Sequence, residues 1–390
     1  AVTGVAEGAG TPVVFEAATS TYLTATYDST NNKVVIAYQD GGNSNYGTAV
    51  VGTVSGTTIS FGTPVVFETG TVSYNSATYD VANGKVVIAY SDSGNSSYGT
   101  AVVGTVSGTS ISFGSPVVFL SGYTFYTSAA YDSTNNKTVI AYRDSITTNY
   151  GTAIVGTVSG TSISFGTAVV FESAATSYIS ATYDSTNGKV VIAYRDGGNS
   201  NYGTAIVGTV SGTSISFGTE VVFESAITIY ISSAFDSNSG KVVIAYRDDA
   251  SVFYYGTAIV GTVSGTSISF GSPAVFNAAL TTYTSTTFDS TNNKVVIAYT
   301  TNPLTGLSIV GTVSGTSISF GSATTIHTAG SSYTAATYDS NANKVVIAYQ
   351  DNGNSAYGTA AVLTVGSSNN TSFIGITAEA ISSAATGPVN

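Results

Sequence analysis

The chain has 390 residues, of which only 8% are charged, a formal net charge of −11 and no cysteine. The acidity excludes nucleic acid as an expected partner, because polyphosphate would be repelled, and the lack of cysteine excludes disulfides, zinc–thiolate sites and thiol catalysis. The longest recurring apolar run, VVIAY, is far shorter than the roughly 20 residues that span a membrane, so no membrane insertion is expected. Because the chain has no Met, we expect a processed product or a fragment.

The sequence is built from an internal repeat. A segment of the form KVVIAY occurs seven times, beginning at Lys33, Lys85, Lys137, Lys189, Lys241, Lys294 and Lys344. The copies are 52, 52, 52, 52, 53 and 50 residues apart, and we number the units repeat one to repeat seven. A period of about 50 residues favours a β-propeller blade over leucine-rich and β-helical coils, which repeat at roughly 20 to 30 residues or fewer.

Each repeat contains four strand-like segments separated by turns. In repeat one they are YLTATYD, KVVIAYQD, YGTAVVGTV and TISFGTPVVFE, at residues 22–28, 33–40, 46–54 and 58–68. The DSTNN and SGT segments between them carry the Asx, Ser and Gly residues of hairpin turns, and no helical period is present. The first strand is made of small residues, which suit the centre of a ring, and VVIAY is apolar on both faces, as expected between two neighbouring sheets.

These features predict an all-β fold, a seven-bladed β-propeller with four antiparallel strands per blade. A copy of the GTPVVFE-type segment precedes the first innermost strand, at residues 11–16, whereas the third strand of repeat seven is followed by a divergent sequence. We therefore expect residues 11–16 to complete the last blade and to remove an exposed strand edge. The predicted propeller covers residues 1–373, and residues 374–390 are assigned to a tail or to the start of a following module.

Loop sequences divide the predicted ring into two faces. Because antiparallel strands alternate in direction, the turns after the first and third strands share one face, and the loops after the second strand and between repeats share the other. The first set hardly changes, as in DSTNNK and SGTSIS, and forms the constant face. The second set changes from DGGNSNYG to DSITTNYG and DDASVFYYG, and forms the variable face. Binding residues are often carried by such loops, with neutral drift as the alternative explanation.

The variable face is predicted to be acidic and to carry the ligand. The lysines of the repeats lie in constant turns beside Asp residues, whereas the Asp and Glu residues of the variable face are offset only by Arg143, Arg195 and Arg247. Aromatic side chains beside carboxylates and arginines are typical of sugar-binding and protein-docking surfaces. The predicted ligand-binding residues are Tyr123, Phe125, Tyr126, Arg143, Asp144, Arg195, Arg247, Asp248, Phe253, Tyr254 and Leu304.

No catalytic residue, cofactor or metal site is predicted. The three arginines occupy equivalent places in successive repeats, which ring geometry separates by about 10 Å, too far to share one carboxylate. His327 is the only imidazole and is expected to be an ordinary exposed side chain. The constant turn from Asp28 to Lys33 has one carboxylate beside an ammonium, so it is interpreted as a structural Asx-turn and not as a calcium loop.

One turn resembles a known structural motif. DSGNSSY, at Asp92–Tyr98, and its relatives beginning at Asp40, Asp196 and Asp351 are similar to the Asp-box of sialidases and related propellers. Repeats three, five and six depart from this pattern. In those families the box stabilises the fold, so the resemblance implies no activity.

The repeat as a whole resembles arrays in structural proteins of tailed bacteriophages. The similarity rests on units such as YDSTNNKVVIAY with GTAVVGTVSGTSISFG and on the terminal FIGITAEAISSAATG, at residues 373–387. It implies a virion appendage at the virion surface or outside the cell, such as a tail-fibre or host-recognition component. The implied partners are a host-surface glycan or receptor and other virion proteins. Two alternatives stay open: a structural or decoration protein that docks to virion proteins, and a multivalent lectin with one weak site per blade.

Overall fold

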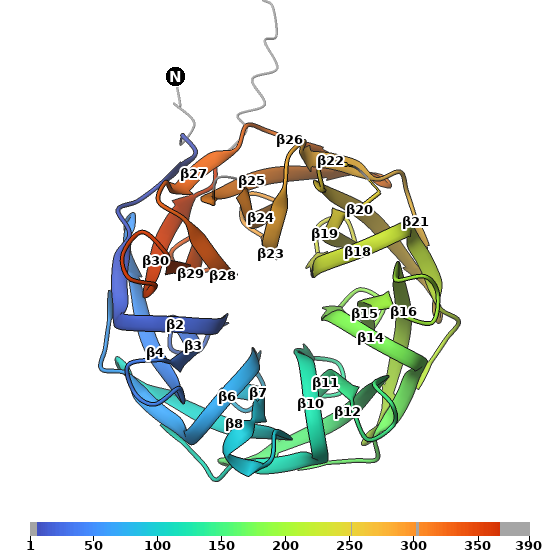
Figure 1. Cartoon of the computed structure of the whole chain (residues 1–390), viewed down its shortest axis with the longest axis horizontal. Helices are drawn as coiled ribbons and strands as arrows, with labels where there is room; N and C mark the ends of the chain where they lie inside the picture. The colour runs from blue at the N-terminus through green and yellow to red at the C-terminus, as the bar shows by residue number, and fades with distance from the viewer. Residues whose placement is uncertain (1–5, 251, 302–303, 367–390) are drawn as a thin grey trace, which may run out of the picture.

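The computed structural model describes residues 6–250, 252–301 and 304–366, which form an almost entirely β structure arranged as a ring (Figure 1). Its elements are β1 (Gly8–Ala9), β2 (Val13–Asp28), β3 (Lys33–Asp40), β4 (Tyr46–Ser55), β5 (Thr58–Phe61), β6 (Val65–Asp80), β7 (Lys85–Asp92), the 3₁₀ turn η1 (Ser93–Asn95), β8 (Tyr98–Ser107), β9 (Ser110–Phe113), β10 (Val117–Asp132), β11 (Lys137–Asp144), β12 (Tyr150–Ser159), β13 (Ser162–Phe165), β14 (Val169–Asp184) and β15 (Lys189–Asp196). They continue with β16 (Tyr202–Ser211), β17 (Ser214–Phe217), β18 (Val221–Asp236), β19 (Lys241–Asp248), β20 (Tyr255–Ser264), β21 (Ser267–Phe270), β22 (Ala274–Asn277), β23 (Thr281–Asp289), β24 (Lys294–Thr301), β25 (Thr305–Ser314), β26 (Ser317–Phe320), β27 (Thr324–His327), β28 (Ser331–Asp339), β29 (Lys344–Asp351) and β30 (Tyr357–Thr364). Within these described ranges, no helix has the length and apolar character needed to cross a membrane.

Every repeat folds into the same antiparallel sheet. In repeat one, the second half of β2 pairs with β3, β3 pairs with β4, and β4 pairs with β5 and then with the first residues of β6. The prediction of an all-β fold made of repeated antiparallel sheets is therefore confirmed. The predicted tail or following module, at residues 374–390, lies outside the described residues.

Long strands link one sheet to the next. The first residues of β6 pair with β4 of repeat one, and its second half pairs with β7 of repeat two. The link is interrupted before β23 and before β28, so β23 to β27 form a separate five-stranded sheet and strand pairing does not run around the ring as one closed sheet. Local geometry differs at both interruptions: the Asn277 amide donates to the Ala279 carbonyl, and Gly330 adopts a φ of 98°.

The hydrophobic core lies between neighbouring sheets. One cluster joins Val35 and Ala37 of repeat one to Val86 and Ile88 of repeat two, and the tyrosine that ends each VVIAY segment is fully buried. Both faces of the second strand are therefore covered, as its continuous apolar run predicts.

Small hydroxyl side chains form hydrogen bonds between neighbouring innermost strands. β2, β6, β10, β14, β18, β23 and β28 lie nearest the middle of the ring (Figure 1). The backbone N–H of Ala77 donates to Thr24 Oγ1 at 3.0 Å, and the N–H of Ala129 donates to Ser76 Oγ at 2.9 Å. Only short side chains allow strands to approach this closely, which accounts for the small residues of the first strand.

The first and last repeats are packed against each other. The first half of β2 pairs with β30, with Val13 opposite Ala360. Phe15 and Val34 share a core cluster with Val346 and Ala348. The N-terminal strand thus occupies the place that the GTPVVFE-type segment takes at the end of the other repeats.

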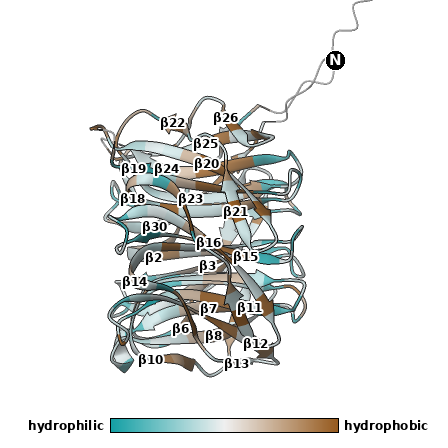
Figure 2. Cartoon of the chain, turned by 90° about the vertical axis from the view of Figure 1, so that its right-hand side faces the viewer, coloured by the Kyte–Doolittle hydropathy of each residue, from teal (hydrophilic) through white to brown (hydrophobic). Residues whose placement is uncertain are grey.

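The two sets of loops lie at opposite ends of the strands, as the side view shows (Figure 2). On the variable face, the N–H of Gly41 donates to the carbonyl of Thr19, which ties the loop after the second strand to the segment between repeats. On the constant face, Asp28 Oδ1 accepts from the N–H groups of Thr30 and Asn31, so the Asx-turn interpretation is confirmed.

Candidate functional site

A closed ring of tyrosines, which we call the tyrosine ring, lines the central pocket next to the variable loops. It consists of one residue from each repeat: Tyr22, Tyr74, Tyr126, Tyr178, Tyr230, Tyr283 and Tyr333. Successive ring centroids lie 5.1–5.5 Å apart, and Tyr22 and Tyr333 close the series at 5.4 Å. The central pocket that they line has a volume of about 230 Å³.

The tyrosine ring depends on an unusual backbone conformation. Each of its members has a φ of 50–54°, in the left-handed region, where a bulky side chain costs about 1–3 kcal/mol. In repeat one the strand pairing shifts register between Thr21 and Thr24, so Tyr22 lies in a β-bulge. Bulges re-aim side chains, and strained residues cluster at binding sites, so this position is the first candidate for function.

Three arginines lie against one arc of the tyrosine ring. The guanidinium carbon of Arg195 lies 5.2 Å from the ring centroid of Tyr178. Arg143 contacts both Phe125, at 4.4 Å, and Tyr126, at 5.1 Å. Because a cation over an aromatic face is attracted to it, these contacts hold the guanidinium groups in place.

The third arginine differs from the other two because it has an acidic partner. Arg247 lies over Tyr230 at 5.4 Å and over Tyr254 at 5.0 Å. It also donates from Nε to Asp249 Oδ1 at 2.6 Å and from Nη2 to Oδ2 at 3.0 Å. Within the described part of the chain, Arg143 and Arg195 form no ion pair, and the buried Nε of each has no hydrogen-bond partner.

The pocket also contains an amide without a partner. Asn75 is 9% exposed and lines the pocket beside Tyr74, and neither its Oδ1 nor its Nδ2 has a hydrogen-bond partner among the described residues. At the equivalent place in repeat three, the hydroxyl of Thr127 donates to the carbonyl of Tyr74. A buried amide without partners costs free energy unless a ligand or water supplies them.

Burial keeps two members of the tyrosine ring neutral at ordinary pH. Burial, followed by the neighbouring tyrosines Tyr22 and Tyr126, raises the pKa of Tyr74 to about 12. Burial and then Tyr283 and Tyr178 raise the pKa of Tyr230 to about 12. The pocket therefore presents neutral hydroxyl groups and aromatic faces to whatever enters it.

Two carboxylates of the variable face that were predicted to bind the ligand accept hydrogen bonds from their own turns. Asp144, expected to be a ligand-binding carboxylate, is only 6% exposed, and its Oδ1 accepts from the N–H of Ile146. Asp248 is less deeply placed, but its Oδ1 accepts from the N–H of Ala250 in the same way. Each of these two carboxylates thus holds the turn that follows a second strand, although repeats three and five depart from the Asp-box pattern.

Most glutamates of the variable face are engaged by the buried tyrosines below them. Tyr38 donates to Glu16 Oε2 at 3.0 Å, and Tyr246 donates to Glu224 Oε2 at 2.9 Å. In repeat three the glutamate is replaced by Leu120, and the Tyr142 hydroxyl has no partner among the described residues. The Tyr–Glu pair is thus part of the repeat and is not a separate nucleophile.

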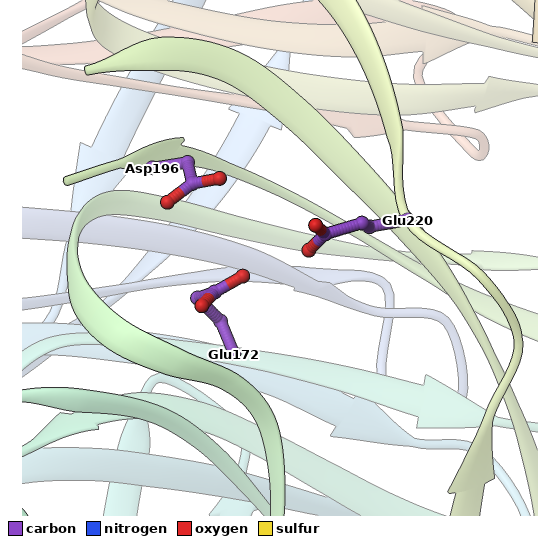
Figure 3. Close-up of side chains that lie close together, drawn as sticks. All are labelled: Glu172, Asp196 and Glu220. Carbon is purple, nitrogen blue, oxygen red and sulfur yellow. The ribbon is translucent and has the colours of Figure 1, made fainter. Parts of the chain in front are cut away.

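One of these glutamates belongs to a cluster of three carboxylates. Glu172, Asp196 and Glu220 each have an oxygen within 4.8 Å of the others (Figure 3). Tyr194 donates to Glu220 at 2.9 Å and to Glu172 at 3.4 Å. Burial and then the contact with Glu220 raise the pKa of Glu172 to about 7. The three oxygens could hold a cation.

His327 is not the exposed side chain that the sequence predicts. It occupies the glutamate position of the repeat, its side chain is 17% exposed, and its ring centroid lies 5.3 Å from that of Tyr349. His327 Nε2 lies 2.7 Å from Asp351 Oδ1, without the alignment of a hydrogen bond. The imidazole therefore packs in the place where other repeats hold a carboxylate.

Several predicted residues lie away from the tyrosine ring. Tyr123 is 58% exposed and pairs with Tyr98 at a strand edge. Phe253 is 61% exposed and stacks on Tyr255 at 6.1 Å. Phe253 and Tyr254 also line a second pocket of about 420 Å³ with Leu280, between the loops of repeats five and six. Leu304 is exposed, with a φ of 75°.

The structure thus places some of the predicted ligand-binding residues at the tyrosine ring and the others elsewhere on the variable face. Phe125, Tyr126, Arg143, Arg195 and Arg247 meet at the tyrosine ring. Sequence reasoning missed the other members of this ring and Asn75. A signal for the ring is present in the sequence: every variable loop between repeats, from EAATSTY to HTAGSSY, ends in Tyr.

Comparison with known proteins identifies the fold. No protein-family model and no curated protein matches the sequence. Among solved structures, the chain is similar to the BP39L lectin from Burkholderia pseudomallei, with a TM-score of 0.64 and 9% identity over 87% of this chain and 94% of the lectin. It is also similar to a chain in the crystal structure of the mitotic checkpoint complex, with a TM-score of 0.61 and 7% identity over 92% of both chains. These likenesses show a repeat-array, β-propeller-like fold.

Proposed function

We propose that this chain is a non-enzymatic, seven-bladed propeller module of a virion appendage, which binds host-surface carbohydrate through its variable face. The observation that carries the proposal is the tyrosine ring, with arginines held against one arc of it. Aromatic faces stack on sugar rings, while neutral hydroxyls and guanidinium groups hydrogen-bond to sugar oxygens.

The seven-bladed interpretation is supported by contacts between the two ends of the ring. Each of the seven sequence repeats contributes one tyrosine, and the contact of Tyr22 with Tyr333 leaves no place for a further member. The pairing of Val13 with Ala360 gives repeat seven the strand that its own sequence lacks.

The hydrogen bonds of the acidic side chains support a binding role over a catalytic one. Asp144, Asp196 and Asp351 cap turns, and Glu16 and Glu224 accept from buried tyrosines. These carboxylates are thus held by the fold, whereas acid–base catalysis needs groups that face a substrate. The likeness of the fold to that of the BP39L lectin is compatible with a carbohydrate-binding role and supports the proposal.

The placement on a virion rests on the resemblance of the repeats and of residues 373–387 to phage structural proteins. The two alternatives are a structural protein that docks to virion proteins and a lectin with one site per blade. Convergence of the tyrosines on one central pocket favours a single site over seven separate ones.

A glycan array run beside host-cell binding tests the proposal. The intact chain is compared with a variant in which the variable loops of repeats three, five and six are replaced by DGGNSNYG and ESAATSY from repeat four. We expect glycan and cell binding by the intact chain and weaker binding by the variant, which keeps Tyr126 and the three arginines but loses Phe125 and other side chains of the variable loops. A structural block would bind no glycan, and a lectin with one site per blade would bind several ligands per chain and keep most of its binding in the variant.

A further inference from the structure

We propose that the central pocket and the adjoining arginines bind one acidic oligosaccharide, with carboxylates of successive sugars paired to Arg143 and Arg195. This inference rests on the proposed carbohydrate binding and adds to it the class of sugar and the position of the site. Three independent features of the described structure support it.

The first feature is the state of the two arginines. Arg143 and Arg195 are partly buried, and each is held against a tyrosine that lines the pocket, yet neither contacts a carboxylate within the described residues. Their Nε atoms are buried without a hydrogen-bond partner. A guanidinium that contacts an aromatic ring through its carbon still has N–H donors for a carboxylate, which is the planar partner that these donors fit best.

The second feature is the asymmetry of the arc. The equivalent residues in the other repeats are neutral: Gln39, Ser91, Thr300 and Gln350. Arg247 is already paired with Asp249, which leaves the arginines of repeats three and four as the adjacent cationic groups without a carboxylate partner in the described chain. An oligosaccharide with acidic groups on neighbouring sugars matches this pair, although the chain as a whole carries a net charge of −11.

The third feature is the unpaired amide of Asn75 in the pocket. Its Oδ1 and Nδ2 are buried without partners, next to Tyr74 and one repeat away from Tyr126. An amide accepts from one sugar hydroxyl and donates to another, which suits a sugar ring that enters between the tyrosines. The pocket volume of about 230 Å³ is below the usual range for drug-sized ligands, so we expect it to admit a single sugar unit.

The test compares acidic polysaccharides with their own neutral forms. Polygalacturonate and alginate oligosaccharides, which carry a carboxylate on every sugar, are immobilised beside carboxyl-reduced samples of the same oligosaccharides. Sulfated oligosaccharides without carboxylates are immobilised as a further comparison. Binding of the intact chain is measured by interferometry, and stoichiometry by calorimetry with the tightest soluble ligand. We expect at least one carboxylated sample to bind about tenfold or more tightly than its reduced form, with one ligand per chain.

Variants assign the preference to the two arginines. The double variant Arg143→Gln and Arg195→Gln should fold normally, because Gln39 and Gln350 occupy the same place in repeats one and seven. It should lose the preference for carboxylated sugars. The matched control, Lys85→Gln with Lys189→Gln, removes the same charge from the constant face and should keep the preference. Asn75→Leu, which copies Leu23 of repeat one, should weaken binding of both sugar forms.

The outcomes separate this inference from the proposed function. Glycan binding that ignores carboxyl reduction, or a preference for carboxylated sugars that survives in the arginine variant, overturns the inference and leaves carbohydrate binding in place. Preference for the sulfated samples alone overturns the carboxylate assignment. Failure to bind any glycan, on this panel and on a general array, overturns the proposed function together with the inference.

Discussion

Arg247 and Asp249 form a two-bond ion pair, with Nε–Oδ1 and Nη2–Oδ2 distances of 2.6 and 3.0 Å, at the edge of the tyrosine ring. Asp249, two residues after Arg247, thus occupies N–H donors of Arg247 that could otherwise bind a carboxylate of the ligand. Arg143 and Arg195 are followed at that distance by Ser145 and Gly197, which cannot act in this way.

Removal of Asp249 should therefore strengthen binding of an acidic oligosaccharide. We expect Asp249→Gly, which copies Gly197 of repeat four, to tighten binding roughly three- to tenfold, because one more guanidinium becomes available to a carboxylate. Calorimetry with the ligand identified on the polysaccharide panel measures the change. Ser93→Asp, at the equivalent exposed position of a repeat without arginine, is the control and should leave the affinity unchanged. Weaker binding by Asp249→Gly would contradict this account of the pair.

Removal of a buried tyrosine hydroxyl should change the free energy of unfolding differently according to whether the hydroxyl has a hydrogen-bond partner. Tyr142 has no partner among the described residues, so Tyr142→Phe should leave the free energy of unfolding unchanged or raise it by up to about 1 kcal/mol. Tyr246 donates to Glu224, so Tyr246→Phe should lower the free energy of unfolding by about 1–2 kcal/mol.

Urea denaturation of the two variants checks this pair of predictions. Both keep the aromatic contacts of the parent, because Phe119 and Phe223 lie 5.1 and 5.2 Å from the tyrosine rings concerned. Equal losses of stability would show that the hydroxyl partners do not matter.

Because neighbouring sheets pack closely at Gly114, replacement of this glycine should lower the free energy of unfolding. A Cβ on Gly114 would overlap the carbonyl oxygen of Thr161 in the next repeat, whereas a Cβ on Gly321 would find only the Val310 carbonyl, at 3.9 Å. Gly114→Ala should therefore lower the free energy of unfolding by about 1–3 kcal/mol, while Gly321→Ala changes it little. Both glycines follow SISF in the sequence, so the second variant is a matched control. Similar urea midpoints for the two variants would argue against this packing.

The carboxylate cluster should make stability depend on pH. The pKa of Glu172 is about 7 in the folded chain against an ordinary value of 4.5, because of burial and then the contact with Glu220. Between these pH values the folded chain holds a proton that the unfolded chain releases, so this group's contribution to the free energy of unfolding is full below pH 4.5 and is lost as the pH rises through 7.

The variant Glu220→Ala, which copies Ala168, should flatten that dependence by removing the acidic neighbour. Urea denaturation at intervals from pH 4.5 to 8 follows the change, and Glu68 supplies a control because it forms no such cluster with a second glutamate in the described chain. Glu68→Gln should leave the slope between pH 5 and 7 that Glu172 causes. An unchanged slope in Glu220→Ala would mean that Glu220 does not set the pKa of Glu172.

The repeated architecture could be predicted because its causes are local and recur in every unit. The two-sided burial of VVIAY, the Asx-turn at Asp28 and the small residues beside Thr24 each follow from residue type and spacing. The break in strand pairing before β23 lies beside the hydrogen bond from the Asn277 amide to the Ala279 carbonyl, a local feature that a repeat pattern does not reveal.

The site was predicted less completely than the fold, because burial decides what a charged side chain can do. The sequence suggests that the aspartates of the variable face are free to bind a ligand. In the structure, however, Asp144 is buried and accepts a hydrogen bond from the N–H of Ile146. From the sequence, the tyrosine at the end of each variable loop looks like an ordinary strand residue. The β-bulge at positions such as Tyr22 directs its side chain to the central pocket. Recurrence of a side chain at the end of otherwise variable loops is the sequence signal that identifies them.

The pairing of β2 with β30 sets the order in which this protein can be completed during synthesis. Val13 leaves the ribosome before the seven KVVIAY-type segments, whereas its partner Ala360 emerges only after all of them. Until then the nascent chain carries an unfilled strand edge, and near-identical VVFE segments of other nascent chains compete for it. Closed rings should therefore form best when chains are dilute, and crowded polysomes should yield interlinked products.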